Sequence, residues 1–460
     1  VHIPPPGPGE PRELHFPKTE SRALESGLQI LTAPSEGLPI VYAELVFRVG
    51  DAHAPRDRAG LATLTAKMLE LGTKKRSQEA LAEAIEYLGA SLHISSDPDS
   101  VRIRIRSLSE HLGEVLSLLD EIGFDPSFDQ AELDKLKRRE LDRLNLNLAN
   151  PDYLSRIHFY EALYGEHPYA ELDTDEEVIQ SLKRSDLISF HQAHFTPENA
   201  VLIVAGEVDE GSLREAIDAS FGKRAAKAKA VERAELPEPK RAQGTRVLLI
   251  DRPESVQSTI RIGNLALPRS APDYLALEVA NEVLGGSASS RLFMDLREKR
   301  SLTYGAYSGV ASRVGVGPFA AMTRVRNEVT FEAIDAMFEH LARIVSEAPS
   351  ETELEAAKNA LILSFPRSID SLGKIVDLLA ERVLYGLPDD YWDRYREQVA
   401  EIGLEQALEA ANRYIRPKDA LLVVVGKASE LAEGLRRYGP VSVVDARGSL
   451  LRALPALESD

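Results

Sequence analysis

The 460-residue chain contains no cysteine. Disulfide bonds, thiol catalysis and cysteine-ligated metal sites are therefore excluded. The sequence also lacks any apolar run of the about 18 residues that a membrane-spanning helix needs. We therefore expect no membrane span.

Cationic residues are few relative to acidic ones. The chain has 55 lysines and arginines against 73 aspartates and glutamates, which gives a net charge of −18. Because nucleic acids are bound through clustered cationic surface, this balance argues against nucleic acid as a general partner. It is compatible with attraction of basic peptides.

What the chain does contain is a repeat. Phe195-Thr196-Pro197-Glu198-Asn199-Ala200 precedes the apolar run V-L-I-V-A-G, and Ile415-Arg416-Pro417-Lys418-Asp419-Ala420 precedes L-L-V-V-V-G, 220 residues later. In each copy a helical segment ends near a proline and a strand-length run stops at glycine. Two copies at this spacing predict a duplicated domain rather than a solenoid, whose periods are shorter.

Hydrophobic periodicity predicts a mixture of helices and strands in both halves. Expected strands are 40–48, 101–106, 246–250, 258–263 and pieces of 305–325. Expected helices are 57–71, 77–88, 108–122, 129–147, 273–284, 289–299, 328–346 and 350–385. The pattern predicts an α+β fold in which helices cover two mostly antiparallel sheets.

Composition divides the chain further. We expect an extended Pro/Gly-rich segment at 1–20, an N-terminal domain at 21–221, a C-terminal domain at 246–450 and a tail at 451–460. The intervening segment 222–245 is charged and poor in large apolar residues, which is typical of an exposed linker.

One segment carries a family resemblance. Residues 60–76 read G-L-A-T-L-T-A-K-M-L-E-L-G-T-K-K-R. The frame around the five central positions resembles the zinc-binding helix of the pitrilysin/insulinase peptidases, the processing-peptidase branch in particular. Further landmarks occur in the family's order, at His167-Pro168-Tyr169, 195–199, 251–258 and 289–304. The resemblance spans nearly the whole chain and implies half of a clamshell-shaped chamber.

The zinc motif itself is missing. Active relatives have H-x-x-E-H where this chain has Thr63, Leu64, Thr65, Ala66 and Lys67. Thr63 offers a weak ligand, Ala66 has no base, and Lys67 is cationic and has no lone pair to donate. Aligning the family's third ligand, a glutamate on a later helix, places Arg143 or Leu144 there, and Asp142 is the nearby carboxylate. We expect no metal in this chain and no autonomous peptidase activity.

Another part of the family's active site is retained. Arg297 and Tyr304, seven residues apart, match a pair that the resemblance implies holds the substrate backbone near the scissile bond. Arginine offers fixed planar donors and tyrosine a hydroxyl, and both can stabilise a developing oxyanion. Ser301 stands where the family often has glycine. Alternatively, Arg297 is one of several surface charges and Tyr304 packs at the start of a strand.

The resemblance therefore implies a zinc-less subunit of a heterodimeric peptidase. Arg297 and Tyr304 would act in trans on unstructured peptides at the zinc of a paralogous partner. The alternatives are a structural core-protein-like subunit and a peptide-binding homodimer. Within a chamber, the Val101-Arg102-Ile103-Arg104-Ile105-Arg106 strand would present either a cationic lining or a solvated face. The beginning of the sequence favours an exported, periplasmic protein over a cytoplasmic one.

Overall fold

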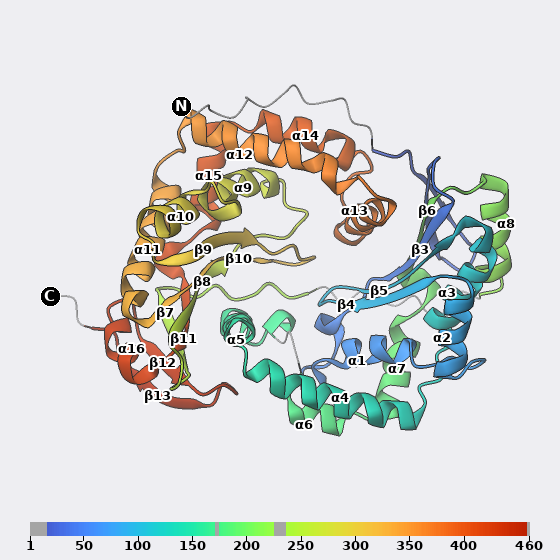
Figure 1. The fold of residues 1–460 in the computed structure, drawn as a ribbon, viewed down its shortest axis with the longest axis horizontal. Helices are drawn as coiled ribbons and strands as arrows, with labels where there is room; N and C mark the ends of the chain where they lie inside the picture. Colours follow the sequence, from blue (N-terminus) through green and yellow to red (C-terminus); the bar gives the residue numbers. More distant parts are fainter. Residues whose placement is uncertain (1–15, 171–173, 225–235, 458–460) are drawn as a thin grey trace, which may run out of the picture.

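The computed structural model describes residues 16–170, 174–224 and 236–457, and these form two halves with one sheet each (Figure 1). Most of the predicted N-terminal segment, the middle of the predicted linker and the end of the predicted tail lie outside the described residues. No helix in the described part of the chain is long and apolar enough to cross a bilayer.

The N-terminal half is built on a six-stranded sheet of order β1-β2-β6-β3-β5-β4, in which the β2–β6 pair is parallel and the other pairs are antiparallel. Its strands are β1 (Glu20–Ala23), β2 (Gln29–Pro34), β3 (Ile40–Phe47), β4 (Ser91–Ser96), β5 (Val101–Leu108) and β6 (Ala200–Gly206). Its helices are α1 (Leu61–Leu69), α2 (Gln78–Tyr87), α3 (Leu112–Phe124), α4 (Gln130–Leu148), α5 (Pro151–Tyr164), α6 (Glu176–Ser181), α7 (Arg184–His194) and α8 (Glu210–Phe221).

The C-terminal half repeats this plan on a seven-stranded sheet of order β13-β12-β7-β11-β8-β10-β9. Its strands are β7 (Arg246–Asp251), β8 (Gln257–Leu265), β9 (Thr303–Val310), β10 (Pro318–Arg326), β11 (Leu421–Gly426), β12 (Val441–Val444) and β13 (Leu450–Leu454). Its helices are α9 (Tyr274–Asn281), α10 (Arg291–Phe293), α11 (Thr330–Ser346), α12 (Glu351–Ser364), α13 (Leu372–Tyr385), α14 (Tyr391–Glu401), α15 (Leu404–Tyr414) and α16 (Ala428–Leu435). π-helical turns follow α9 and α10.

The predicted α+β class, with two related and mostly antiparallel sheets, is confirmed. The single helix predicted over 350–385 is wrong. It is two helices, α12 and α13, separated by a short turn at Phe365–Ser368 that contains Pro366. Proline lacks the N–H that would continue a helix and clashes with the preceding turn. Strand β13 pairs with β12 as far as Leu454, so the tail boundary predicted at 450/451 falls inside a strand.

The two halves exchange a helix. Helix α13 of the C-terminal half packs on β3 and β6 of the N-terminal sheet, and α5 of the N-terminal half packs on β8 and β11 of the C-terminal sheet. Both helices end at a Tyr-Gly pair, Tyr164-Gly165 and Tyr385-Gly386. Figure 1 shows each helix beside the opposite half's sheet. Neither sheet is therefore covered on both faces by its own half alone.

The exchange explains why the two repeated strands are apolar throughout. In β6, Val201, Ile203 and Ala205 belong to the core that includes α13, whereas Leu202 and Val204 belong to the N-terminal core. In β11 the residues 220 positions later divide in the same way, and Leu421, Val423 and Val425 pack with α5. A strand buried on both faces loses the polar alternation of a half-exposed strand.

Polar contacts reinforce the exchange. Glu44 of β3 is almost completely buried and accepts from Arg102 and Arg104 of β5. Both arginines also reach Asp377 of α13, at 3.0 and 2.6 Å. The cationic face predicted for this strand is thus neutralised at Arg102 and Arg104, and Arg106 stays exposed near the Tyr42 ring. Neither predicted alternative, a cationic lining or a solvated face, describes the two paired arginines.

Candidate functional site

Helix α1 carries the positions of the missing zinc motif. The Asp51 carboxylate accepts from the backbone N–H groups of Ala62 and Thr63 at 3.0 and 3.2 Å, and it also accepts from the Thr63 hydroxyl. Ala66 is buried. One turn beyond Thr63, Lys67 extends its ammonium to Glu140 of α4, with 2.6 Å between Nζ and Oε1.

Glu140 is a carboxylate of α4 that the sequence analysis did not single out. The predicted positions of the third ligand, Arg143 and Leu144, lie about one helical turn further along α4. Asp142, the carboxylate singled out from the sequence, is exposed. Arg143 instead donates to the second oxygen of Glu140 at 2.7 Å. Residues three and four positions apart lie on one face of a helix, so Glu140 shares a face with Arg143 and Leu144. This periodicity could have identified Glu140 from the sequence.

These side chains do not fit a zinc ion. Both oxygens of Glu140 are engaged by cations of the same chain, and its side chain is only 6% exposed. Thr63 is committed to Asp51. A zinc site would need neutral imidazoles and a base at positions that hold a threonine, an alanine and an ammonium. The Lys67–Glu140 ion pair joins α1 to α4, and both oxygens of this carboxylate are already paired with cations of the chain.

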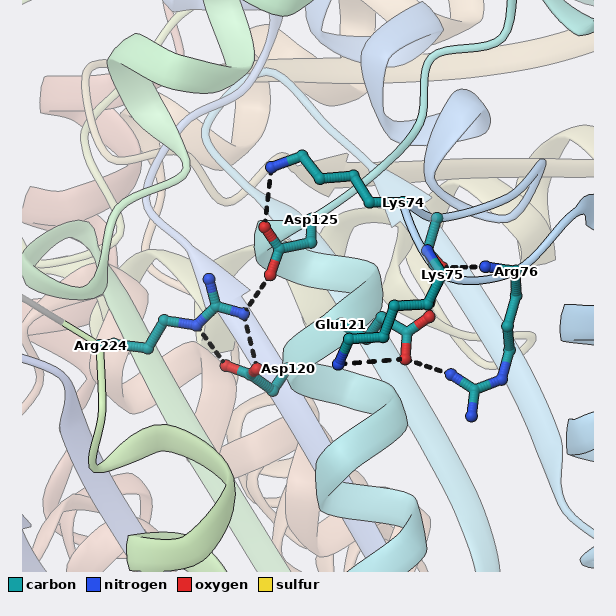
Figure 2. A network of polar contacts seen from close by, with 8 residues as sticks. Lys74, Lys75, Arg76, Asp120, Glu121, Asp125 and Arg224 are labelled. Atoms are coloured by element: carbon teal, nitrogen blue, oxygen red, sulfur yellow. Dashed lines mark hydrogen bonds and ion pairs between the residues drawn. The ribbon is translucent and has the colours of Figure 1, made fainter.

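The Gly-Thr-Lys-Lys-Arg run after α1, part of the family frame, makes the polar contacts drawn in Figure 2. The Thr73 hydroxyl and the Arg76 guanidinium both donate to Glu121, a buried residue of α3. Lys74 binds Asp125 at 2.9 Å, and Arg224, which follows α8, bridges Asp125 and Asp120. The run therefore fixes the loop that leaves α1 to the end of α3, and it forms no catalytic site.

Arg297 lies in the π-helical turn Met294–Lys299 that continues α10. Its guanidinium lies over the ring of Phe293, 4.8 Å from the centroid, and its Nε is 3.3 Å from the exposed Glu298. The side chain is 46% exposed. Arg297 therefore rests on an aromatic surface and keeps much of its donor capacity for another molecule.

Ser301 separates Arg297 from Tyr304 and has a left-handed backbone, with φ of 54°. Its N–H donates to the Arg297 carbonyl at 3.2 Å, a hydrogen bond that caps the end of the helical turn. A side chain is strained in this conformation, whereas glycine is not. The departure from the family's glycine thus places a strained residue between the two predicted site residues.

Tyr304 projects from β9, the edge strand of its sheet, and is 92% exposed. Thr303 pairs with Val325 and Ala306 pairs with Thr323, so β9 carries one extra residue at this point. This β-bulge places Tyr304 and Gly305 opposite the single residue Arg324, and the Tyr304 ring projects away from the sheet into solvent. The alternative in which Tyr304 packs at the strand start is wrong.

The structure places the two sets of site residues apart. Figure 1 shows α1 in the N-terminal half and α10 on the far side of the C-terminal half. Arg297 and Tyr304 are presented together from one short segment that contains a π-turn, a left-handed serine and a β-bulge. Such backbone irregularities cluster at functional sites.

Family models match both halves of the chain. The insulinase (peptidase family M16) model matches residues 29–171, and the model described as peptidase M16 inactive domain matches residues 181–361. The chain belongs to the insulinase family. This M16 chain therefore has the family's two related domains, and the helix that resembles the zinc-binding helix carries the Lys67–Glu140 ion pair.

The names of some relatives of this M16 chain describe a protein or domain that is not an active peptidase. A "non-peptidase homolog YmxG" of Helicobacter pylori is 23% identical over 412 residues, which is 88% of this chain and 94% of that protein. A Pseudomonas fluorescens structure described as a peptidase M16 inactive domain superposes with a TM-score of 0.80 and 27% identity, over 89% and 98% of the two chains.

A longer structure shares the fold. The Escherichia coli periplasmic protease PqqL superposes with a TM-score of 0.74 and 16% identity, over 90% of this chain and 48% of PqqL. At this identity the match shows the fold alone. The M16 chain described here thus has the architecture of about half of the longer protein.

The Lys67–Glu140 pair predicts that a metal site can be restored. We expect the triple variant Thr63→His, Ala66→Glu, Lys67→His to bind about one zinc per chain, because the two imidazoles share the face that meets Glu140. Bound metal would be measured by mass spectrometry after dialysis. Adding Glu140→Gln should weaken binding at least about tenfold. A folded triple variant that retains no zinc would show that Glu140 is not at the ligand position.

Ser301→Gly is expected to stabilise the chain by about 0.5–1 kcal/mol in urea unfolding. Glycine relieves the left-handed strain, and part of that gain is offset by its greater freedom in the unfolded chain. Ser301→Ala keeps the Cβ atom and serves as the control, with no expected gain. Equal stability of the two variants would contradict the strain.

An ion pair between a buried arginine and a half-buried glutamate joins the helix that leads to Arg297 to α12. Arg291 of α10 binds Glu353 of α12 through two hydrogen bonds, of 2.7 and 3.0 Å. The hydrogen bond from Arg291 is the main cause that lowers the pKa of Glu353 to about 2. Since the folded pKa is below the unfolded value, this contribution to stability is complete above the unfolded pKa and is lost as the pH falls toward 2.

Glu353→Gln is therefore expected to destabilise the chain by about 1–2 kcal/mol at pH 7, after allowance for partial exposure. The difference from the unmodified chain should shrink as the pH falls from about 4.5 toward 2. Denaturant unfolding at several pH values measures it. A difference that stays constant across this window would mean that charge on Glu353 is not its source.

Proposed function

We propose that this M16 chain is the zinc-less subunit of a two-chain peptidase, in which Arg297 and Tyr304 act on peptide bound at the zinc site of a paralogous partner. The observation that carries the proposal is an asymmetry within one chain. The metal position is filled by an internal ion pair, whereas the Arg297–Tyr304 pair is presented to the outside.

Exposure favours an external target for the pair. A tyrosine that serves only folding normally buries its ring, yet Tyr304 is 92% exposed. The bulge that turns it outward gives up regular strand pairing at that point. The donors of both side chains suit a peptide carbonyl and the negative charge that develops on it.

The sheet edges suit an extended peptide. Strands β4 and β9 each form one end of their sheet, so each has a backbone edge that pairs with no other strand in the described part of the chain. An unstructured peptide can add to such an edge through main-chain hydrogen bonds, without strong sequence preference. Tyr304 lies on β9, at one of these edges.

The partner would supply the zinc ion and the general base, since Thr63, Ala66 and Lys67 stand at those positions of α1 in this chain. An exported, periplasmic location is part of the proposal, and the fold shared with a periplasmic protease supports it. The two alternatives, a structural subunit and a peptide-binding homodimer, require no exposed Arg/Tyr pair.

The proposal predicts activity only in a mixture. Neither this chain alone nor a zinc-motif paralogue alone is expected to cleave a quenched unstructured peptide at the rate of the two combined, and a chelator should abolish the gain. In the complex, Arg297→Ala should lower kcat/KM by about 100-fold and Tyr304→Phe by about 10-fold, because each removes a donor to developing charge.

Matched controls are available on the surface. Tyr87→Phe changes a tyrosine that is 88% exposed on α2, and Arg394→Ala changes an exposed arginine of α14. Both are expected to leave kcat/KM within about twofold. Full activity of Arg297→Ala and Tyr304→Phe in an intact complex would refute the proposal, and absence of any complex would favour the homodimer or the structural role.

A further inference from the structure

The bulge that presents Tyr304 is bridged by two threonine hydroxyl groups, one on each strand. Thr303 and Thr323 face the core side of β9 and β10, and Thr323 is 6% exposed. Their Oγ1 atoms are 3.0 Å apart. They lie directly beneath the extra residue of β9, where regular pairing between the strands is interrupted.

The two hydroxyls satisfy the backbone groups that the bulge leaves without ladder partners. The Gly305 N–H donates to Thr303 Oγ1 at 3.2 Å. The Thr303 hydroxyl lies 2.7 Å from the Arg324 carbonyl, and the Thr323 hydroxyl lies 2.9 Å from the Gly305 carbonyl. Because each hydroxyl has one proton and can also accept, all three hydrogen bonds can form together.

Removing either hydroxyl would take away a hydrogen-bond partner of a backbone group in the bulge, which weakens the bulge. The strand could recover that loss by returning to regular pairing. Since side chains alternate between the faces of a strand, a shift by one residue would turn Tyr304 toward the core. The orientation of Tyr304 therefore depends on two atoms that it does not contact.

We propose that Thr303 and Thr323 are positioning residues for Tyr304, and that their paired hydroxyls fix the β-bulge from which the tyrosine reaches the substrate of the two-chain peptidase. The inference rests on the proposed function for its effect on catalysis. Its structural part concerns this chain alone and is tested separately.

The test uses valine, which keeps the shape and the β-branching of threonine and removes the hydroxyl. In the complex with the zinc-motif partner, Thr303→Val is expected to lower kcat/KM by about 3- to 10-fold, mostly through kcat. In a Tyr304→Phe background the same change should have no further effect, because the hydroxyl that it positions is already absent. Thr303→Ser, which retains the hydroxyl, should restore the rate to within about twofold.

A second readout needs no partner and no activity. Amide hydrogen exchange of the isolated chain is expected to show faster exchange at Gly305 in Thr303→Val, by about tenfold, with little change in strands away from the bulge. Thr323→Val provides a second variant. If Thr303→Val fails to fold, the exchange of Gly305 in Thr323→Val tests whether the hydroxyl groups hold the bulge. Melting temperatures of all variants are compared first.

The outcomes separate the two ideas. If Tyr304→Phe itself leaves the complex fully active, the proposed function fails, and hydrogen exchange still reports on the bulge. If Tyr304→Phe lowers the rate but folded Thr303→Val and Thr323→Val do not, the positioning role is overturned. An equal loss from Thr303→Val in the Tyr304→Phe background would likewise overturn it, because the hydroxyl would then act independently of Tyr304.

Discussion

The exchange of α5 and α13 is the constraint on which the rest of the structure depends. Each sheet needs an apolar cover on its second face, and each receives it from the other half of the chain. Burial of this kind is the main favourable term in folding, at about 1.5–3 kcal/mol for each large side chain fully buried. The halves are related as a duplicated pair, but they are not independent folding units.

The exchange also determines how the site segments are placed. The zinc-helix position in α1 and the Arg297–Tyr304 segment are fixed to different sheets of one rigid unit, on different sides of it. The two sheets are joined through α13, whose Asp377 binds Arg102 and Arg104 of the N-terminal sheet. Under the proposed function, the Arg297–Tyr304 pair acts at a zinc site that another chain supplies.

Local sequence patterns were enough to predict the duplication, the two repeated strands and the segment that carries Arg297 and Tyr304. The repeated Pro-turn-strand segments gave the duplication, and the apolar runs gave β6 and β11. The family frame located Arg297 and Tyr304, whose placement depends on spacing within one short segment. The left-handed Ser301 was visible in advance only as a departure from a family glycine.

Long-range placement was not predictable from these patterns. The apolar runs of β6 and β11 indicate burial on both faces but do not indicate which helix covers each face. Glu140 was not singled out because its ion pair with Lys67 joins residues 73 positions apart, which no local pattern indicates. The bulge at Tyr304 arises from a mismatch between two strands, which neither strand's own sequence reveals.

The Lys67–Glu140 pair has a consequence for metal supply. In a metallopeptidase helix the ion itself holds two helices together, so scarcity of the ion weakens the fold as well as the chemistry. Here an ammonium that is part of the covalent chain joins α1 to α4. No chelator or competing metal can remove it. The contact between α1 and α4 in this chain therefore remains under zinc starvation.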